Sequence, residues 1–268
     1  MMTRTDVLND YLQIREIGRT VNRSLSRKLT QEVLHEGARK LGMLQDGVLV
    51  LESQAMSSVL MDYCIYYVFQ DGLNAFERYL KQFPPHPNSE AMAFFQSQRG
   101  GYYSLVSILE LEPGVGAHVM DLFRDEEGFV VDVNMSRTMS PEMLLAGRIV
   151  PRDGYLMTGG ASLPLYMGAF NKLVRDLQLR FGPAPDWTRI TRAQEADMAA
   201  MVIRACLEFG REVRMKCAPQ GEETFPTAPE PQRTRASGER TGRVVTRNAP
   251  CPCLSGRKYK ACCGRGSW

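Results

Sequence analysis

Apolar residues recur at spacings of mostly three or four over much of residues 1–99, which predicts a helical region. From about Thr5 to Leu44 two such runs pass through Leu8, Leu12, Ile14, Ile17 and Val21, and then through Leu29, Val33, Leu34 and Leu41. From about Ser53 to Phe83 a longer and more apolar helical stretch follows, with a break expected near Gly72. The segment Pro84-Pro85-His86-Pro87 ends it, because proline lacks the amide hydrogen that a helix interior needs.

The pattern changes after Gly100-Gly101, and residues 100–165 predict a small antiparallel β-barrel-like region. Short runs rich in β-branched and aromatic residues alternate with turn signals such as Pro113-Gly114 and Asp153-Gly154. The predicted strands are Tyr102–Leu111, Ala117–Phe123, Gly128–Val133, Leu144–Val150 and Gly154–Met157. Five short strands joined by tight turns favour a barrel or a curled sheet.

Helical sequence returns over residues 166–217. One helix is predicted from about Tyr166 to Arg180, and a second from Thr191 to about Met215, where Thr191 and Gln194 have the spacing of a capping box. Residues 218–246 are dominated by Pro, Glu, Thr, Arg and Gly and have little apolar surface to bury, which predicts a flexible linker before a short tail at 247–268. The expected fold class is therefore α+β.

Charge is distributed unevenly along the chain. From Pro231 to Trp268 nine basic residues accompany one acid, Glu239, so this part carries +8 of a chain whose net charge is +3. Residues 1–230 consequently carry −5. A basic tail on an acidic body indicates that the tail meets an acidic partner.

Four of the seven cysteines fall within thirteen residues near the end of the sequence: Cys251, Cys253, Cys262 and Cys263. In a reducing compartment such a cluster is more often a metal site than a set of disulfides. Two disulfides, or four free surface cysteines, are the alternatives. The segment around the cluster is too small to fold on apolar burial, whereas structural zinc can supply on the order of 10–16 kcal/mol.

Zinc favours four tetrahedral ligands and binds thiolates well. Because all four positions would be taken by sulfur, we expect one structural zinc per chain and no open position for catalysis. Four thiolates around Zn²⁺ carry a charge of −2, which the neighbouring Arg257, Lys258 and Lys260 would offset.

The string from Arg247 to Gly264, Arg-Asn-Ala-Pro-Cys-Pro-Cys-Leu-Ser-Gly-Arg-Lys-Tyr-Lys-Ala-Cys-Cys-Gly, resembles the SEC-C motif. This motif is named for the C-terminus of the SecA translocation motor. The resemblance implies zinc at the same four cysteines and a partner such as the export chaperone SecB or the ribosome, with Arg257, Lys258, Tyr259 and Lys260 in the partner-binding surface. Leu254 departs from the pattern, since the family usually has glycine there. The body resembles uncharacterised regions that accompany SEC-C tails in bacterial proteins, through Val119–Leu122, Ser136-Arg137 and Gly147–Pro151.

The body shows no string typical of an enzyme. His35-Glu36 begins like a zinc-peptidase helix, but Arg39 stands where the second histidine belongs. The aromatic run Tyr63, Tyr66, Tyr67 and Phe69 is interpreted as helix core. A small barrel can bind nucleic acid, and Arg137, Arg148 and Arg152 are the candidates for that role.

The favoured function is a zinc-binding interaction protein whose tail recruits an acidic chaperone surface, a ribosome or another translation or export partner. An enzyme of unknown class with an accessory tail, or a nucleic-acid-binding protein, are the alternatives. No run reaches the roughly 18 apolar residues of a membrane span, and the first residues carry no apolar signal region, so a cytoplasmic protein is expected.

Overall fold

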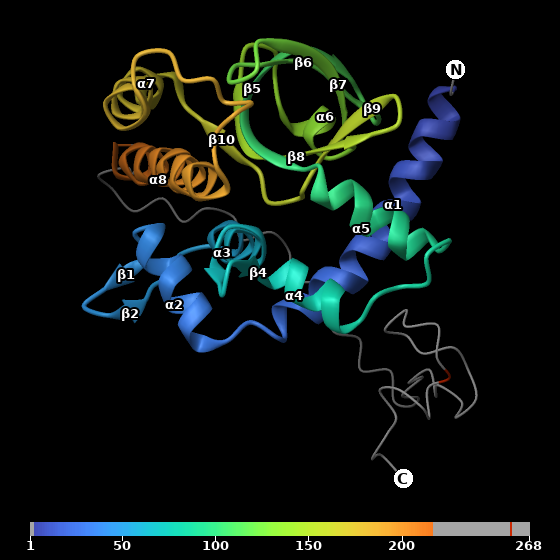
Figure 1. The fold of residues 1–268 in the computed structure, drawn as a ribbon. Coiled ribbons are helices and arrows are strands. Elements are labelled where there is room, and N and C mark those ends of the chain that lie inside the picture. Colours follow the sequence, from blue (N-terminus) through green and yellow to red (C-terminus); the bar gives the residue numbers. More distant parts are fainter. Residues whose placement is uncertain (1–2, 217–257, 259–268) are drawn as a thin grey trace, which may run out of the picture. The chain divides into compact units, whose positions relative to one another are not determined.

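The computed structural model describes residues 3–216 and Lys258. The chain divides into two units, Met1–Phe209 and Gly210–Trp268, and the helices and strands of Figure 1 belong to the first, apart from the end of the last helix. The helices are α1 (Arg4–Ser26), α2 (Gln31–Lys40), α3 (Gln54–Tyr66), α4 (Ala75–Gln82), α5 (Glu90–Arg99), α6 (Met135–Thr138), α7 (Met167–Phe181) and α8 (Arg192–Lys216). The strands are β1 (Leu44–Gln45), β2 (Val48–Leu49), β3 (Phe69–Gln70), β4 (Leu73–Asn74), β5 (Tyr102–Glu112), β6 (Gly116–Asp121), β7 (Glu126–Val131), β8 (Leu144–Arg152), β9 (Tyr155–Thr158) and β10 (Leu163–Leu165). The α+β class predicted from the sequence is confirmed.

Five strands close a barrel. Their order is β8-β5-β6-β7-β9, and β9 pairs back onto β8, while β10 adds to β8 from outside the ring. Every neighbouring pair is antiparallel except β7 and β9, which are parallel. The short helix α6 lies between β7 and β8 in the chain. This connectivity is that of the five-stranded Greek-key barrel of OB-folds.

Strand β5 is long because it belongs to both halves of the barrel. Residues 102–107 pair with β8, residues 106–112 pair with β6, and the register shifts between Ile108 and Glu110. An extra residue in one strand bends it and increases its twist, which helps five strands to close. The barrel interior is filled by Val106, Ile108, Ala117, Val119, Val130, Met135, Leu145 and Ile149.

The helices use the outer face of β5 and β8 as part of their own core. On that side Tyr103, Leu105, Ala146 and Val150 join a larger cluster built from α1, α2, α3, α4, α5, α7 and α8. Both faces of β5 through Val106 and of β8 through Val150 are therefore buried, which explains why these segments read as nearly continuous apolar runs instead of alternating ones. Within residues 3–216, none of the helices has the length and apolarity to cross a membrane.

The predicted helices are confirmed, but the two N-terminal stretches contain hairpins that the sequence pattern did not reveal. Asp46-Gly47 joins β1 to β2, and Asp71-Gly72 joins β3 to β4 at the break expected near Gly72. All four turn residues have positive φ, between 50° and 78°, as a type I′ turn requires. Strands of two residues are too short to show a period of two, so only the Asp-Gly pair indicated them.

The predicted capping box at the start of α8 is confirmed. The Thr191 amide donates to Gln194 Oε1 at 2.8 Å, and the Gln194 amide donates to Thr191 Oγ1 at 3.3 Å. These two bonds satisfy donors that the first turn of a helix leaves without partners. The helix therefore begins where the sequence indicated.

Candidate functional site

The residues predicted to hold zinc lie outside the part of the chain that the structure describes. This applies to Cys251, Cys253, Cys262 and Cys263, and also to Arg257, Tyr259 and Lys260 of the predicted partner surface. Lys258 is described, and its side chain is exposed. Their arrangement therefore remains a prediction.

Two other cysteines are described, and both are buried free thiols. Cys64 lies in α3 and Cys206 in α8. Burial raises the pKa of each thiol to about 12, so both stay protonated at neutral pH and are poor metal ligands. Across residues 3–216 no three His, Cys, Asp or Glu side chains gather closely enough to hold a metal ion.

The barrel arginines proposed for nucleic-acid contact are mostly engaged inside the protein. Arg148 is 3% exposed. Arg152 forms an ion pair with Asp10 at 2.8 Å, beside the Tyr155 hydroxyl, which donates to the same carboxylate at 2.6 Å. Of the three, Arg137 is the one with an exposed side chain. The interpretation of Arg148 as a nucleic-acid contact is therefore wrong, because its guanidinium is a core group.

Arg148 is the centre of a buried polar network between the barrel and the helices. Its Nη1 donates to Gln98 Oε1 at 2.5 Å, and its Nη2 donates to the Gln98 carbonyl oxygen. The guanidinium lies 3.8 Å from the centre of the Tyr66 ring, and the Tyr66 hydroxyl donates to the same Gln98 oxygen at 3.2 Å. Gly101 makes room for the arginine, because a Cβ atom there would lie 2.3 Å from Nη2.

This network forms one wall of a pocket of about 370 Å³ at the junction of α3, α5, β8 and α8. Glu195 of α8 accepts hydrogen bonds from the Tyr67 hydroxyl at 3.2 Å and from the Tyr103 amide at 2.9 Å. Burial raises the pKa of Tyr67 well above its usual value, so the phenol remains a donor. Tyr63, Tyr66 and Tyr67 are buried, as predicted for helix core, whereas Phe69 lies in strand β3 and is half-buried. The polar groups of this pocket satisfy one another, which is the behaviour of a structural network.

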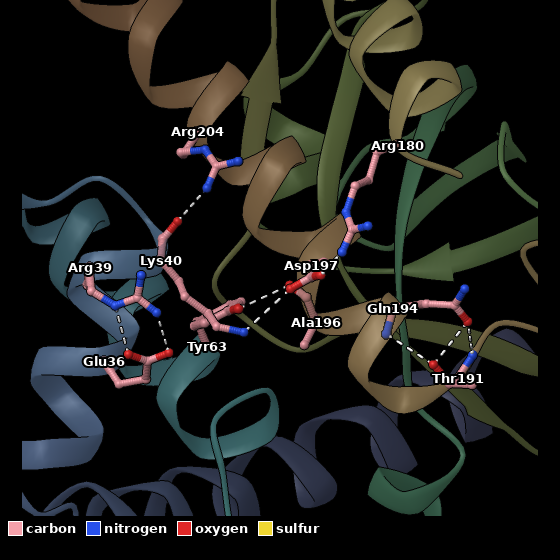
Figure 2. A network of polar contacts seen from close by, with 10 residues as sticks. All are labelled: Glu36, Arg39, Lys40, Tyr63, Arg180, Thr191, Gln194, Ala196, Asp197 and Arg204. Carbon is pink, nitrogen blue, oxygen red and sulfur yellow. Dashed lines mark hydrogen bonds and ion pairs between the residues drawn. The ribbon is translucent and has the colours of Figure 1, made fainter. Parts of the chain in front are cut away.

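A second polar network joins four helices on the opposite side of α8. Figure 2 shows side chains from α2, α3 and α7 converging on the start of α8 around Asp197. Asp197 accepts from Arg180 at 2.7 Å and from Lys40 at 3.4 Å. The Tyr63 hydroxyl donates to the Ala196 carbonyl oxygen at 3.0 Å, and Arg204 donates to the Lys40 carbonyl oxygen at 2.6 Å. Sequence reasoning missed these residues, since they lie far apart in the chain.

Replacing Asp197 by asparagine should lower the free energy of unfolding by at most about 1 kcal/mol at pH 7, because Arg180 and Lys40 also reach solvent. Burial alone would raise the pKa of Asp197, but the bonds from Arg180 and Lys40 outweigh it and hold the pKa below its ordinary 3.8. The carboxylate therefore contributes stability above about pH 4, and the contribution is lost as the pH falls through the folded-state pKa.

Urea denaturation of both proteins between pH 7 and pH 3 measures this difference. The gap should shrink below about pH 4. Asp176→Asn is the matched control, since Asp176 pairs with Lys172 of the same helix in an exposed position and is expected to change stability by about 0.5 kcal/mol or less. A gap that stays constant with pH, or widens on acidification, contradicts the role assigned to Asp197.

The C-terminal string matches the SEC-C motif model over residues 247–265. Three similar curated proteins are each named protein translocase subunit SecA. The relative from Geobacter metallireducens is 51% identical over 45 residues, 17% of this chain and 4% of its own length. The one from Syntrophomonas wolfei is 42% identical over 53 residues, 20% of this chain and 6% of its own. The one from Cellvibrio japonicus is 42% identical over 84 residues, 28% of this chain and 9% of its own. This chain thus spans less than a tenth of the length of these relatives.

No solved structure matches the chain. A second family model covers residues 5–178, which include the helices α1 to α5, the whole barrel and most of α7. Its description is "Family of unknown function (DUF7986)". Because this match extends over more than half of the chain, the protein belongs to that family of unknown function and carries a SEC-C motif at residues 247–265.

Proposed function

We propose that this protein is a zinc-binding interaction protein whose SEC-C tail recruits an acidic protein surface, of the kind found on an export chaperone or a ribosome. The match of residues 247–265 to the SEC-C motif carries the proposal. Similarity to SecA supports it, although the relatives share only a small part of their length with this chain.

Zinc is proposed for this tail because of the donor set. Cys251, Cys253, Cys262 and Cys263 provide four thiolates, which fill a tetrahedral zinc site and leave no position for water. The metal would supply the stability that a segment with so few apolar residues lacks. Its role is then structural, and it shapes the surface around Tyr259.

Charge supports an acidic partner. With the zinc site counted at −2, the part of the chain from 231 to 268 keeps a net charge of about +6. We propose that Arg257, Lys258, Tyr259 and Lys260 form the contact surface, and that residues 218–246 link it to the body. Basic groups speed the encounter with an acidic partner, while the zinc-supported shape selects it.

The test compares the full chain with its Cys262→Ser, Cys263→Ser variant, which has the same number of lysines and arginines. Purified SecB, purified ribosomes and poly(U) RNA are immobilised in turn, and binding is measured at several salt concentrations. We expect the wild type to bind SecB or ribosomes, and the variant to lose that binding at least tenfold. Binding to poly(U) should largely survive, because counterion release depends on the number of basic groups.

Two outcomes contradict the proposal. If the variant binds SecB and ribosomes as well as the wild type does, the tail is a basic tether without a zinc-dependent shape. If the wild type binds neither, recruitment of this class of partner is wrong.

A further inference from the structure

A cleft of about 730 Å³ lies between α1, α3, α5 and the turn after β9. Its volume is in the range of small-molecule sites. Ile14, Ile65, Phe94 and Met157 supply apolar surface to its lining. The remaining lining is mostly polar, and it differs between the two ends of the cleft.

Three arginines of α1 line one side. Arg15, Arg19 and Arg23 follow one another at intervals of four residues, so they form a row along one face of the helix about 12 Å long. Arg19 pairs with Glu16 at 2.8 Å in an exposed position, where the pair contributes little. Within residues 3–216, neither Arg15 nor Arg23 has a carboxylate at ion-pair distance. The row therefore has positive charge available for a ligand.

The opposite wall is the N-terminal part of α3. Ser57 and Ser58 line the cleft there, one turn after Ser53, whose hydroxyl caps the helix by accepting from the Met56 amide at 3.2 Å. Serine hydroxyls donate hydrogen bonds, and the start of a helix carries partial positive charge. Arginines across from hydroxyl donors form a combination that suits a phosphate group.

The other end of the cleft carries a carboxylate, and it lies beside the turn that contains Gly159 and Gly160. A Cβ atom on Gly160 would lie 2.8 Å from Arg15 Nη1, and one on Gly159 would lie 3.7 Å from Asp62 Oδ1. Arg15 and Asp62 thus lie beside neighbouring residues of the same turn. Asp62 lies at least one turn along α3 from Ser57 and Ser58, and Arg23 lies two turns along α1 from Arg15. The carboxylate and the outer arginines therefore lie at different ends of the cleft.

Two acceptors at the cleft have no hydrogen-bond donor among the described residues. The Asn22 Oδ1 atom is buried and lacks a partner. Asp62 has no hydrogen bond from the body, and burial raises its pKa to about 6, which the nearby Arg148 opposes. An acceptor without a donor is costly where it is buried, as Asn22 Oδ1 is. The half-buried Asp62 carboxylate can accept from a hydroxyl or amino group of a ligand at its own end of the cleft.

We infer that this cleft binds a phosphorylated small molecule, with the phosphate between Arg19, Arg23 and the serines of α3, and with a hydroxyl- or amino-bearing part facing Asp62. The carboxylate excludes a phosphate from its own end, so the ligand enters in one orientation. Nucleotides and sugar phosphates share this chemistry, and the cleft volume accommodates either. This inference is independent of the role proposed for the tail.

Isothermal titration calorimetry on the full chain tests it, with AMP, ribose 5-phosphate, adenosine and inorganic phosphate as probes. We expect AMP or ribose 5-phosphate to bind with a dissociation constant of about 1 mM or below, at least tenfold more tightly than adenosine and inorganic phosphate. AMP binding far more tightly than ribose 5-phosphate identifies a nucleotide site, and comparable affinities identify a sugar-phosphate site.

Variants locate the site. Arg23→Ala should weaken the preferred probe at least tenfold, while Arg27→Ala, a change of the same charge just beyond the cleft on the C-cap of α1, should leave it within twofold. Asp62→Asn should weaken the preferred probe but not inorganic phosphate. Thermal melts confirm that each variant is folded. Absence of saturable binding of both AMP and ribose 5-phosphate at 10 mM overturns the inference, as does equal weakening by Arg23→Ala and Arg27→Ala.

Discussion

Replacing Cys262 and Cys263 by serine should reduce the zinc content of the purified chain from about one atom per molecule to near zero. Two thiolates remain in the variant, and a structural zinc site needs four ligands to exclude water and hold the metal tightly. Because binding of structural zinc is worth on the order of 10–16 kcal/mol, the loss should be complete under ordinary purification. Elemental analysis after expression in zinc-replete medium measures the metal directly.

Cys206→Ser is the control for loss of a thiol as such, because it removes a cysteine from a buried position in α8, outside the four-cysteine cluster. It should retain about one zinc. Zinc retained in full by the double variant, or absent from the wild type, would show that the four-cysteine assignment is wrong.

Arg148→Met should lower the free energy of unfolding by about 1–3 kcal/mol, the typical loss when buried hydrogen-bond acceptors lose their charged donor. Methionine keeps much of the side-chain length but cannot donate to the two Gln98 oxygens. The substitution also removes the positive charge that lies against the Tyr66 ring. The same charge lowers the pKa of Asp62, in opposition to the effect of burial. Equilibrium denaturation followed by circular dichroism measures the loss.

The matched control is Arg137→Met, since Arg137 is an exposed arginine of the barrel region. It should stay within about 0.5 kcal/mol of the wild type. Gly101→Ala provides an independent route to the same network, because its Cβ would lie 2.3 Å from Arg148 Nη2 and must displace the guanidinium. If Arg148→Met unfolds at the same denaturant concentration as Arg137→Met, the network is not structural.

The local elements of this protein could be predicted because short-range signals specify them. Thr191 and Gln194 mark the start of α8 by satisfying the first amides of that helix. Asp-Gly and Pro-Gly pairs mark turns, since glycine and, less readily, aspartate tolerate positive φ, while proline presets the φ of the first turn position. The SEC-C motif was recognisable for the same reason, since all its residues lie within one string of 18 positions.

The chain also contains the row Arg15, Arg19 and Arg23, whose spacing of four could have been noticed as one helix face. The sequence could not show that this row lines a cleft. A row of arginines on a helix is usually solvated, and what makes this one a wall of a cleft is α3, which begins 28 residues after α1 ends. Two adjacent glycines such as Gly159 and Gly160 indicate a turn, but only the folded chain places Asp62 and Arg15 beside them.

The sequence by itself determined most of the helices, the five strands of the barrel and where four thiols lie close together in the chain, because these properties depend on neighbours a few residues apart. The tertiary structure decided that β9 returns to pair with β8 and closes the barrel. It also decided that Arg148, on a strand that the pattern assigned correctly, lies in the core with Gln98 instead of on a nucleic-acid-binding face. Strand periodicity says that side chains alternate between two faces, but only the packing of the helices against β5 and β8 decides that both faces are buried.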